Sequence, residues 1–149
     1  MRHISFLFLY LLFNANCFSQ SGNISLIPEP VSITKSNGSF TLPSNLTIAV
    51  SKERDLIRIQ QTLSTQLKLA TGKKINNVIL SKNSPTNGIS LLVVKDPSIP
   101  KEGYRLKVSA NGIVLTATSP AGIFSGLQTF LQLFPKELES RTTAKNATA

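Results

Sequence analysis

The chain has 149 residues and a formal net charge of +9, with 16 lysines and arginines against 7 carboxylates. It has one cysteine, which excludes a disulfide framework within the chain. Its only histidine, His3, falls in the N-terminal signal segment described below, so neither a Ser-His-Asp nor a Cys-His catalytic arrangement can be assembled. The basic residues are dispersed and are not interleaved with aromatic side chains, which argues against a nucleic-acid-binding module. We interpret them as solvated charges on a single domain.

Residues 1–20 have the pattern of a secretory signal peptide. Arg2 provides a short positive region, residues 4–13 form an apolar run too short to span a bilayer, and a polar stretch follows. Cys17 offers an alternative in which it is lipidated after processing, but the asparagine before it is larger than such processing prefers. We therefore expect an exported protein, periplasmic or extracellular, without a stable membrane span. Lipid anchoring at Cys17 is the less favoured alternative.

The first part of the exported chain is predicted to be extended. Pro28 and Pro30 exclude a helix from residues 25–42. Residues 46–50 then alternate between apolar and other side chains, which predicts a strand. Ser51 directly after this strand can cap the helix that follows.

That helix is predicted to be amphipathic, with Gly72 as its C-terminal stop. Glu53 and Asp55 fall near its N-terminus, where they complement the helix dipole, and we favour this role over a cation site. Residues 77–80 and 89–94 are predicted to be two further strands. The apolar stripe of the helix consists of Leu56, Ile59, Leu63, Leu67 and Ala70.

Residues 102–118 are predicted to form a β-hairpin. Asn111-Gly112 is a strong signal for a two-residue type I′ turn, which needs φ > 0 at both central positions. This turn pairs Ala110 with Ile113, so one face of the hairpin becomes apolar and the other mostly polar. The apolar face consists of Tyr104, Leu106, Val108, Ala110, Ile113, Leu115 and Ala117.

A second helix is predicted from Ser119, as its cap, and Pro120 to about Phe134. Its apolar residues cover more than half of its circumference, so we expect it to be deeply buried. Gly122 and Gly126 each cost about 1 kcal/mol of helix propensity, which indicates close approach of the sheet. The apolar positions are Ile123, Phe124, Leu127, Phe130, Leu131, Leu133 and Phe134.

The predicted elements follow in the order β-β-α-β-β-β-β-α, counting residues 25–42 as the first extended element. This order favours an α+β fold. We expect a two-layer sandwich, with a mixed or antiparallel sheet and two helices packed on one of its faces.

Two stretches of the sequence carry a resemblance to a known family. The first is Leu26-Ile27-Pro28-Glu29-Pro30 followed by Gly38-Ser39-Phe40, and the second is Ser119-Pro120-Ala121-Gly122 followed by Gly126-Leu127-Gln128-Thr129-Phe130. They resemble the beginning and the end of the N-terminal accessory domain of family-20 glycoside hydrolases, the β-N-acetylhexosaminidases. The resemblance spans residues 26–135.

The resemblance implies an activity for a longer parent protein and not for this chain. Hydrolysis in family 20 uses an adjacent Asp-Glu pair, in which the Glu protonates the leaving oxygen and the Asp orients the acetamido group of the substrate as nucleophile. The chain has no Asp-Glu dipeptide, and Glu137 and Glu139 near its end are interpreted as solvated charges. We therefore predict no catalytic, cofactor-binding or metal-binding residues, no cofactor, and no activity of the chain alone.

The predicted domain organisation is a signal peptide at 1–20, a hexosaminidase-like N-terminal α+β domain at 21–135 and a truncated interdomain linker at 136–149. The expected function is that of a non-catalytic domain of an exported β-N-acetylhexosaminidase. Its expected partner is the catalytic barrel of the same parent chain, through which the parent would act on N-acetylhexosamine-containing glycans.

Two alternatives stay open. One is the accessory domain of another exo-glycosidase, of the α-glucuronidase or O-linked N-acetylglucosamine hydrolase type. The other is a free-standing interaction module. The absence of tryptophan and the presence of only Tyr104 among the tyrosines after residue 20 argue against a sugar-binding platform.

Overall fold

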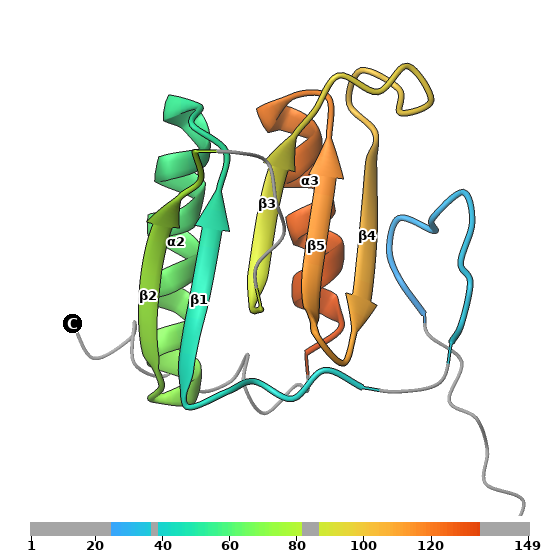
Figure 1. Ribbon diagram of the computed structural model, residues 1–149. Helices are drawn as coiled ribbons and strands as arrows, with labels where there is room; N and C mark the ends of the chain where they lie inside the picture. Colours follow the sequence, from blue (N-terminus) through green and yellow to red (C-terminus); the bar gives the residue numbers. More distant parts are fainter. Residues whose placement is uncertain (1–24, 37–38, 82–86, 135–149) are drawn as a thin grey trace, which may run out of the picture.

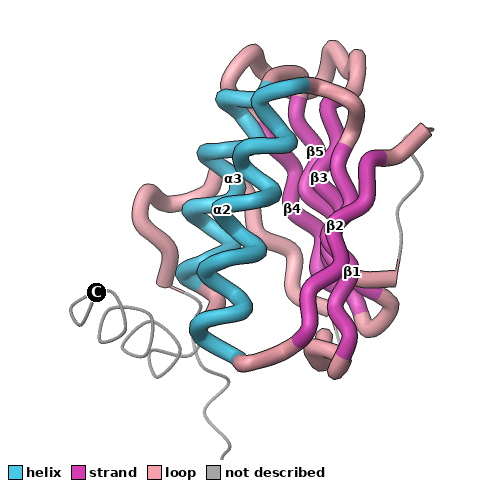
Figure 2. Tube along the Cα trace, turned by 90° about the vertical axis from the view of Figure 1, so that its left-hand side faces the viewer, coloured by secondary structure: helices cyan, strands magenta, loops and turns pink. Residues whose placement is uncertain are grey.

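The computed structural model describes residues 25–36, 39–81 and 87–134. Within these ranges the elements follow in the order β-α-β-β-β-β-α (Figure 1). Figure 2 shows both helices on the same face of the sheet, which confirms the α+β class and the two layers. The elements are β1 (Asn45–Val50), α2 (Arg54–Thr71), β2 (Lys74–Ile79), β3 (Ile89–Val93), β4 (Tyr104–Ser109), β5 (Gly112–Ala117) and α3 (Pro120–Gln132).

The sheet is mixed, with strand order β2-β1-β3-β5-β4. The strands β2, β1, β3 and β5 run parallel to one another. Only β4 runs in the opposite direction, paired with β5. We call the end of the domain at which the parallel strands finish the upper end, as in Figure 1, and the opposite end the lower end. Helix α2 connects β1 to β2 and therefore begins at the upper end and finishes at the lower end.

The hydrophobic core lies between the sheet and the helices. It is built from alternate residues of the strands, as the period of two in a strand requires, and from one stripe of each helix. The strand residues that are almost completely buried in it are Leu46, Ile48, Val50, Ile89, Leu91 and Leu115, and their helical counterparts are Leu56, Leu63 and Ile123.

Helix α2 ends as predicted but begins differently. Gly72 adopts the left-handed conformation at φ 69° and donates its N–H to the Lys68 carbonyl at 2.9 Å. Ser51 does not cap the helix, because its backbone N–H bonds the Leu91 carbonyl of β3 and its hydroxyl accepts the Val93 N–H at 2.9 Å. The N-cap position is occupied by Glu53, whose side chain makes no capping hydrogen bond. The prediction of Ser51 as the cap was therefore wrong.

A polar residue, Gln60, lies inside the buried stripe of α2 and is only 2% exposed. Its amide Nε2 donates to the Ile48 carbonyl of β1 at 2.6 Å and to the Val78 carbonyl of β2 at 3.1 Å. The side chain therefore ties the helix to the two strands that it connects. The predicted stripe omitted this position and included Ile59, which is only partly buried.

The hairpin of β4 and β5 has the predicted faces but a different register. Ile113 pairs with Val108 instead of Ala110, and Ser109 pairs with Gly112. No described non-glycine residue has a positive φ, so Asn111 cannot form the predicted type I′ turn, and the turn residues are Ala110 and Asn111. The observed register differs from the predicted one by two residues, which is one full side-chain period of a strand. Each strand residue therefore lies on the predicted face of the hairpin.

Helix α3 begins as predicted, with the Ser119 hydroxyl accepting the Gly122 N–H at 3.2 Å and Pro120 in its first position. A Cβ atom on Gly122 would lie 2.5 Å from the Gly103 carbonyl oxygen and 2.8 Å from the Ala117 Cβ. A Cβ atom on Gly126 would clash with side chains of β4 and β5. The predicted close approach of the sheet is therefore confirmed.

The predicted deep burial of α3 is wrong for its outer face. Phe124 on that face is 55% exposed. The sheet covers the face with Ile123, Leu127 and Phe130, and the opposite face contacts no described layer.

The segment before β1 does not form the predicted first strand within residues 25–36 and 39–44. Pro28 and Pro30 lack the N–H donors that a ladder needs. Figure 1 shows this segment beside the edge strand β4 and then along the lower end of the sheet. None of the described helices combines the length and apolar character required to cross a membrane.

Candidate functional site

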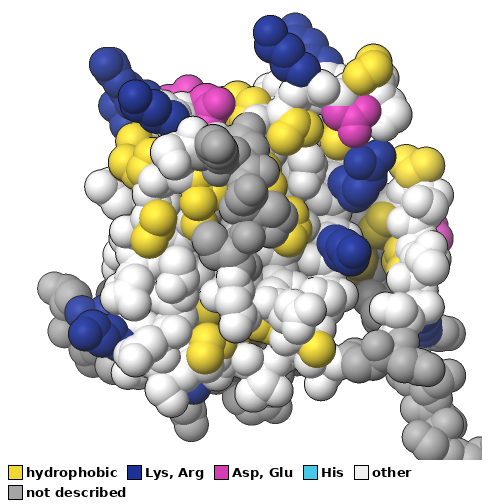
Figure 3. Space-filling view, in the orientation of Figure 1, with side chains coloured by type: hydrophobic (Ala, Val, Ile, Leu, Met, Phe, Trp, Pro, Cys, Tyr) yellow, Lys and Arg dark blue, Asp and Glu magenta, His cyan; other side chains and the backbone are white. Residues whose placement is uncertain are grey.

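The described carboxylates gather mainly at the upper end of the domain. Glu53 and Asp55 lie at the start of α2, and Asp96 and Glu102 lie in the loop between β3 and β4. Figure 3 shows acidic side chains at this end of the face that it presents. The remaining described carboxylate, Glu29, belongs to the segment beside β4.

Asp96 is held by local hydrogen bonds. It accepts the Ser98 N–H at 2.9 Å and the Ser98 hydroxyl at 2.6 Å, and it forms an ion pair with Arg105 at 3.3 Å. The bonds from Ser98, followed by the weaker effect of Arg105, lower the pKa of Asp96. Such a carboxyl stays ionised at neutral pH, so it is unsuited to donate a proton as a general acid.

Replacing Asp96 by alanine should lower the melting temperature slightly at neutral pH and have no effect at strongly acidic pH. The folded-state pKa lies below the unfolded one, so the stabilisation is present above the unfolded pKa and disappears as the pH falls through the folded pKa. Thermal unfolding of both proteins across this pH range measures the difference. A difference that persists at strongly acidic pH would show that the ionised carboxylate is not its source.

The upper end does not combine these carboxylates into a recognisable catalytic or metal-binding group. No cluster of three histidine, cysteine or acidic side chains suited to a metal ion occurs in the part of the chain that the structure describes. Glu53 has a buried oxygen, Oε2, without a hydrogen-bond partner in that part. His3, Cys17, Glu137 and Glu139 lie outside the described residues.

The outer face of α3 is the first of two surfaces that no other described helix or strand covers. No residue of this helix is charged, whereas α2 carries Arg54, Asp55, Arg58 and Lys68. Charged residues are depleted at the centres of protein interfaces, so the composition of the α3 face is typical of a surface that contacts another protein layer. Its exposed residues are Ala121, Phe124, Ser125, Gln128 and Gln132.

The C-terminal end of α3 also anchors the segment beside β4. The Gln132 side chain accepts the Ile27 N–H at 2.9 Å and donates to the Ile27 carbonyl at 2.8 Å. Ile27 and Val31 of this segment are 79% and 107% exposed. An apolar extension is therefore fixed next to the uncharged face of the helix.

The second surface is an apolar hollow of about 480 Å³ at the lower end. Phe130 and Ile113 form buried parts of its wall, and Val108 and Leu133, which also line it, are 40% and 39% exposed. Lys73 contributes a cation to the lining. This hollow could not be predicted from the sequence, because its walls come from four separate parts of the chain. The other lining residues are Phe40, Thr41, Leu42 and Phe134.

The comparisons with known proteins agree on one family. Residues 23–148 match the family described as glycosyl hydrolase family 20, domain 2. A curated relative, the beta-hexosaminidase of Porphyromonas gingivalis, is 34% identical over 119 residues, which are 78% of this chain and 15% of the relative. The chain thus spans a small part of the relative's length.

Solved structures agree in fold. The GH20 beta-N-acetylhexosaminidase of Streptomyces coelicolor A3(2) superposes with a TM-score of 0.68 at 32% identity, over 76% of this chain and 22% of that protein. The N-acetyl-beta-hexosaminidase of Streptomyces plicatus gives a TM-score of 0.65 at 31% identity, over 74% and 21% of the two chains. In both cases the described fold corresponds to about one fifth of the larger protein.

Proposed function

The chain belongs to glycosyl hydrolase family 20, domain 2, and from this membership we propose that it is the non-catalytic N-terminal domain of an exported β-N-acetylhexosaminidase. In this role it packs against a catalytic barrel supplied by the rest of the parent chain. Residues 1–20 direct export, and the parent removes terminal N-acetylhexosamines from glycans.

The proposed lack of catalysis is supported by the sequence. The adjacent Asp-Glu pair that the family's chemistry needs is absent from all 149 residues, and the one histidine lies at position 3. The relatives are four to seven times longer than the matched region, which leaves room for a catalytic domain outside it.

The observation that carries the packing role is the uncharged outer face of α3. Phe124 at its centre is more than half exposed, and burying it against a second domain would remove its apolar surface from water. Left uncovered, such a surface favours self-association. The isolated chain is therefore expected to be less soluble than the parent protein.

Exchanging Phe124 for glutamate should improve the isolated chain and damage the parent protein. In the isolated chain the new charge should raise solubility, whereas in the parent it should lower the melting temperature by several degrees, because a carboxylate would be buried at the interface. The matched control is Gln61→Glu, on the exposed face of α2. If the parent tolerates both changes equally, α3 does not contact the catalytic domain.

The nature of the parent requires a separate test. Sequencing the gene beyond the codon for Ala149 should reveal an in-frame barrel with a His-x-Gly-x-Asp-Glu motif. The parent should hydrolyse p-nitrophenyl N-acetyl-β-glucosaminide, and the chain alone should not. A barrel without that motif would assign the domain to another class of exo-glycosidase.

A further inference from the structure

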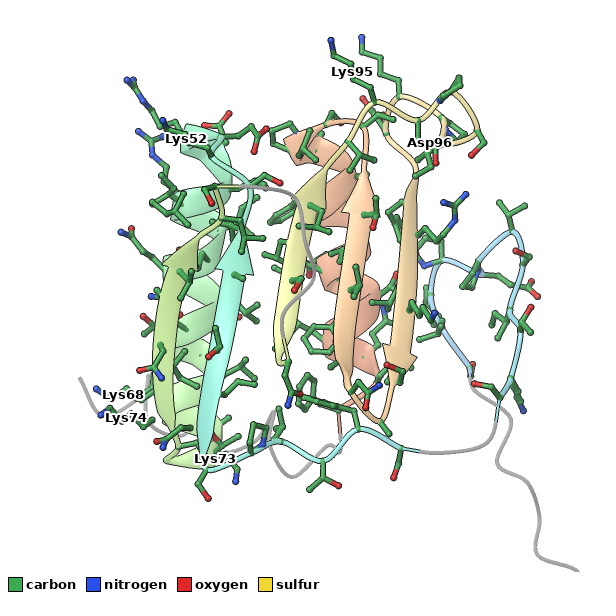
Figure 4. All side chains as sticks on the ribbon, viewed as in Figure 1. Lys52, Lys68, Lys73, Lys74, Lys95 and Asp96 are labelled. Atoms are coloured by element: carbon green, nitrogen blue, oxygen red, sulfur yellow. The ribbon has the colours of Figure 1, made fainter. Side chains whose placement is uncertain are left out.

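Three lysines cluster at the lower end of the domain. Lys68 lies in the last turn of α2, and Lys73 and Lys74 follow where the chain enters β2. Figure 4 shows all three at this end, with Lys68 and Lys74 extending outward to the same side. None of them forms an ion pair with another described residue, so their charges remain available to an outside partner.

The two ends of the domain differ in charge balance. At the upper end, Lys52 and Lys95 lie near the carboxylates of α2 and of the loop after β3 (Figures 3 and 4). At the lower end, the last turn of α2, Gly72 and Lys73 after it and the strand β2 contain no carboxylate, and Asp55 lies at the opposite end of α2. Among the described residues no negative charge therefore cancels the positive field at this end, and that field can attract an anionic surface over about a Debye length.

The same end holds the apolar hollow, and Lys73 belongs to both features. Apolar side chains beside cations are the combination with which peripheral proteins bind anionic membranes: the cations pair with head groups and the apolar groups enter the acyl region. Val108 and Leu133 are the hollow's most exposed apolar side chains. The hollow's volume of about 480 Å³ suits part of one acyl chain.

From this juxtaposition we infer that the lower end of the domain docks on the surface of an anionic lipid bilayer. Lys68, Lys73 and Lys74 contact the head groups, and the hollow receives apolar lipid atoms next to Lys73. The docking leaves the outer face of α3 free, so it is independent of the proposed packing against a catalytic domain.

The test measures co-sedimentation with vesicles of phosphatidylcholine alone or mixed with phosphatidylglycerol. The chain from Ser21 onward is used, because the apolar run at 4–13 would itself enter vesicles and the described core lies wholly after residue 24. Binding should require phosphatidylglycerol and weaken with added salt. Replacing Lys68, Lys73 and Lys74 by glutamine should lower the partition coefficient about a hundredfold, or about fivefold for each lysine.

Two matched controls identify the docking surface. Exchanging Lys52, Lys95 and Lys101 for glutamine removes the same charge from the upper end and should have a much smaller effect. Leu133→Gln, at the hollow, should weaken binding severalfold, whereas Phe124→Gln, away from it, should not. Melting curves verify that each variant is folded.

The inference would be overturned by equal losses in the two triple variants, or by equal binding to neutral vesicles. It would also be overturned if the chain ignored vesicles but bound soluble chondroitin sulfate through the same lysines without dependence on Leu133, because the partner would then be an anionic glycan. None of these results would affect the proposed packing of α3.

Discussion

Replacing Gly122 by alanine should lower the free energy of unfolding by about 2 kcal/mol, although alanine is the better helix former. The added methyl would lie 2.5 Å from the Gly103 carbonyl oxygen, a backbone atom that cannot rotate away, and 2.8 Å from the Ala117 Cβ. To accommodate it, α3 must move off the sheet and lose contacts in the core. Urea unfolding of both proteins measures the change.

The control for this prediction is Ser125→Ala in the same helix. Ser125 is exposed, and its hydroxyl bonds the Ala121 carbonyl one turn back at 3.2 Å, an arrangement that slightly destabilises a helix. Alanine there should therefore stabilise the protein by a few tenths of a kcal/mol. The two substitutions are therefore expected to differ in sign. If Gly122→Ala also stabilised the protein, the close approach of helix and sheet would not be a real constraint on this position.

The elements and their faces could be predicted from the sequence because they depend on local periodicity. Alternation along β4 and β5 identified the apolar face of the hairpin. This face was predicted correctly although the predicted register was wrong by two residues. The two glycines of α3 likewise indicated close packing, since an unfavourable residue inside a helix needs compensation. Both inferences rest on properties of neighbouring residues.

The wrong predictions depend on partners that are distant in the sequence. Ser51 has the composition of a helix cap, but its hydroxyl binds the N–H of Val93, 42 residues away. Whether a serine caps a helix or extends a strand is decided by the pairing of β1 with β3, which no local pattern reveals. In the same way, the apolar character of α3 could not show that the sheet covers only one of its faces.

In the candidate surfaces, too, some features follow from neighbouring residues and others depend on distant parts of the chain. The absence of charge along α3 is readable from the sequence, whereas the exposure of Phe124 is not. Lys68, Lys73 and Lys74 are close in the sequence, but their relation to the hollow depends on Val108 and Leu133, which other elements bring to the lower end. A sequence pattern can therefore indicate residues suited to an interface, and the fold determines which of them lie together.

Gln60 is a buried polar residue that ties α2 to two strands, and Gln60→Ala should destabilise the protein by about 3 kcal/mol. The substitution removes the two hydrogen bonds to the Ile48 and Val78 carbonyls and leaves a cavity between α2 and the sheet. The neighbouring Gln61→Ala, which alters an exposed side chain, should change stability by no more than about 0.5 kcal/mol. Urea unfolding compares the two variants directly.

Two further variants separate the hydrogen bonds from the volume. Gln60→Leu fills the space without a donor, so it should remain clearly destabilising, and a leucine variant as stable as the natural protein would show that the amide bonds contribute nothing. Gln60→Glu should be the most damaging at neutral pH, because it places a buried carboxylate against two carbonyl oxygens. Burial raises the pKa of that carboxyl in the folded state, and a protonated carboxyl can donate again. The destabilisation by glutamate should therefore shrink as the pH falls through the folded-state pKa toward the lower unfolded-state pKa, whereas that by leucine should not change with pH.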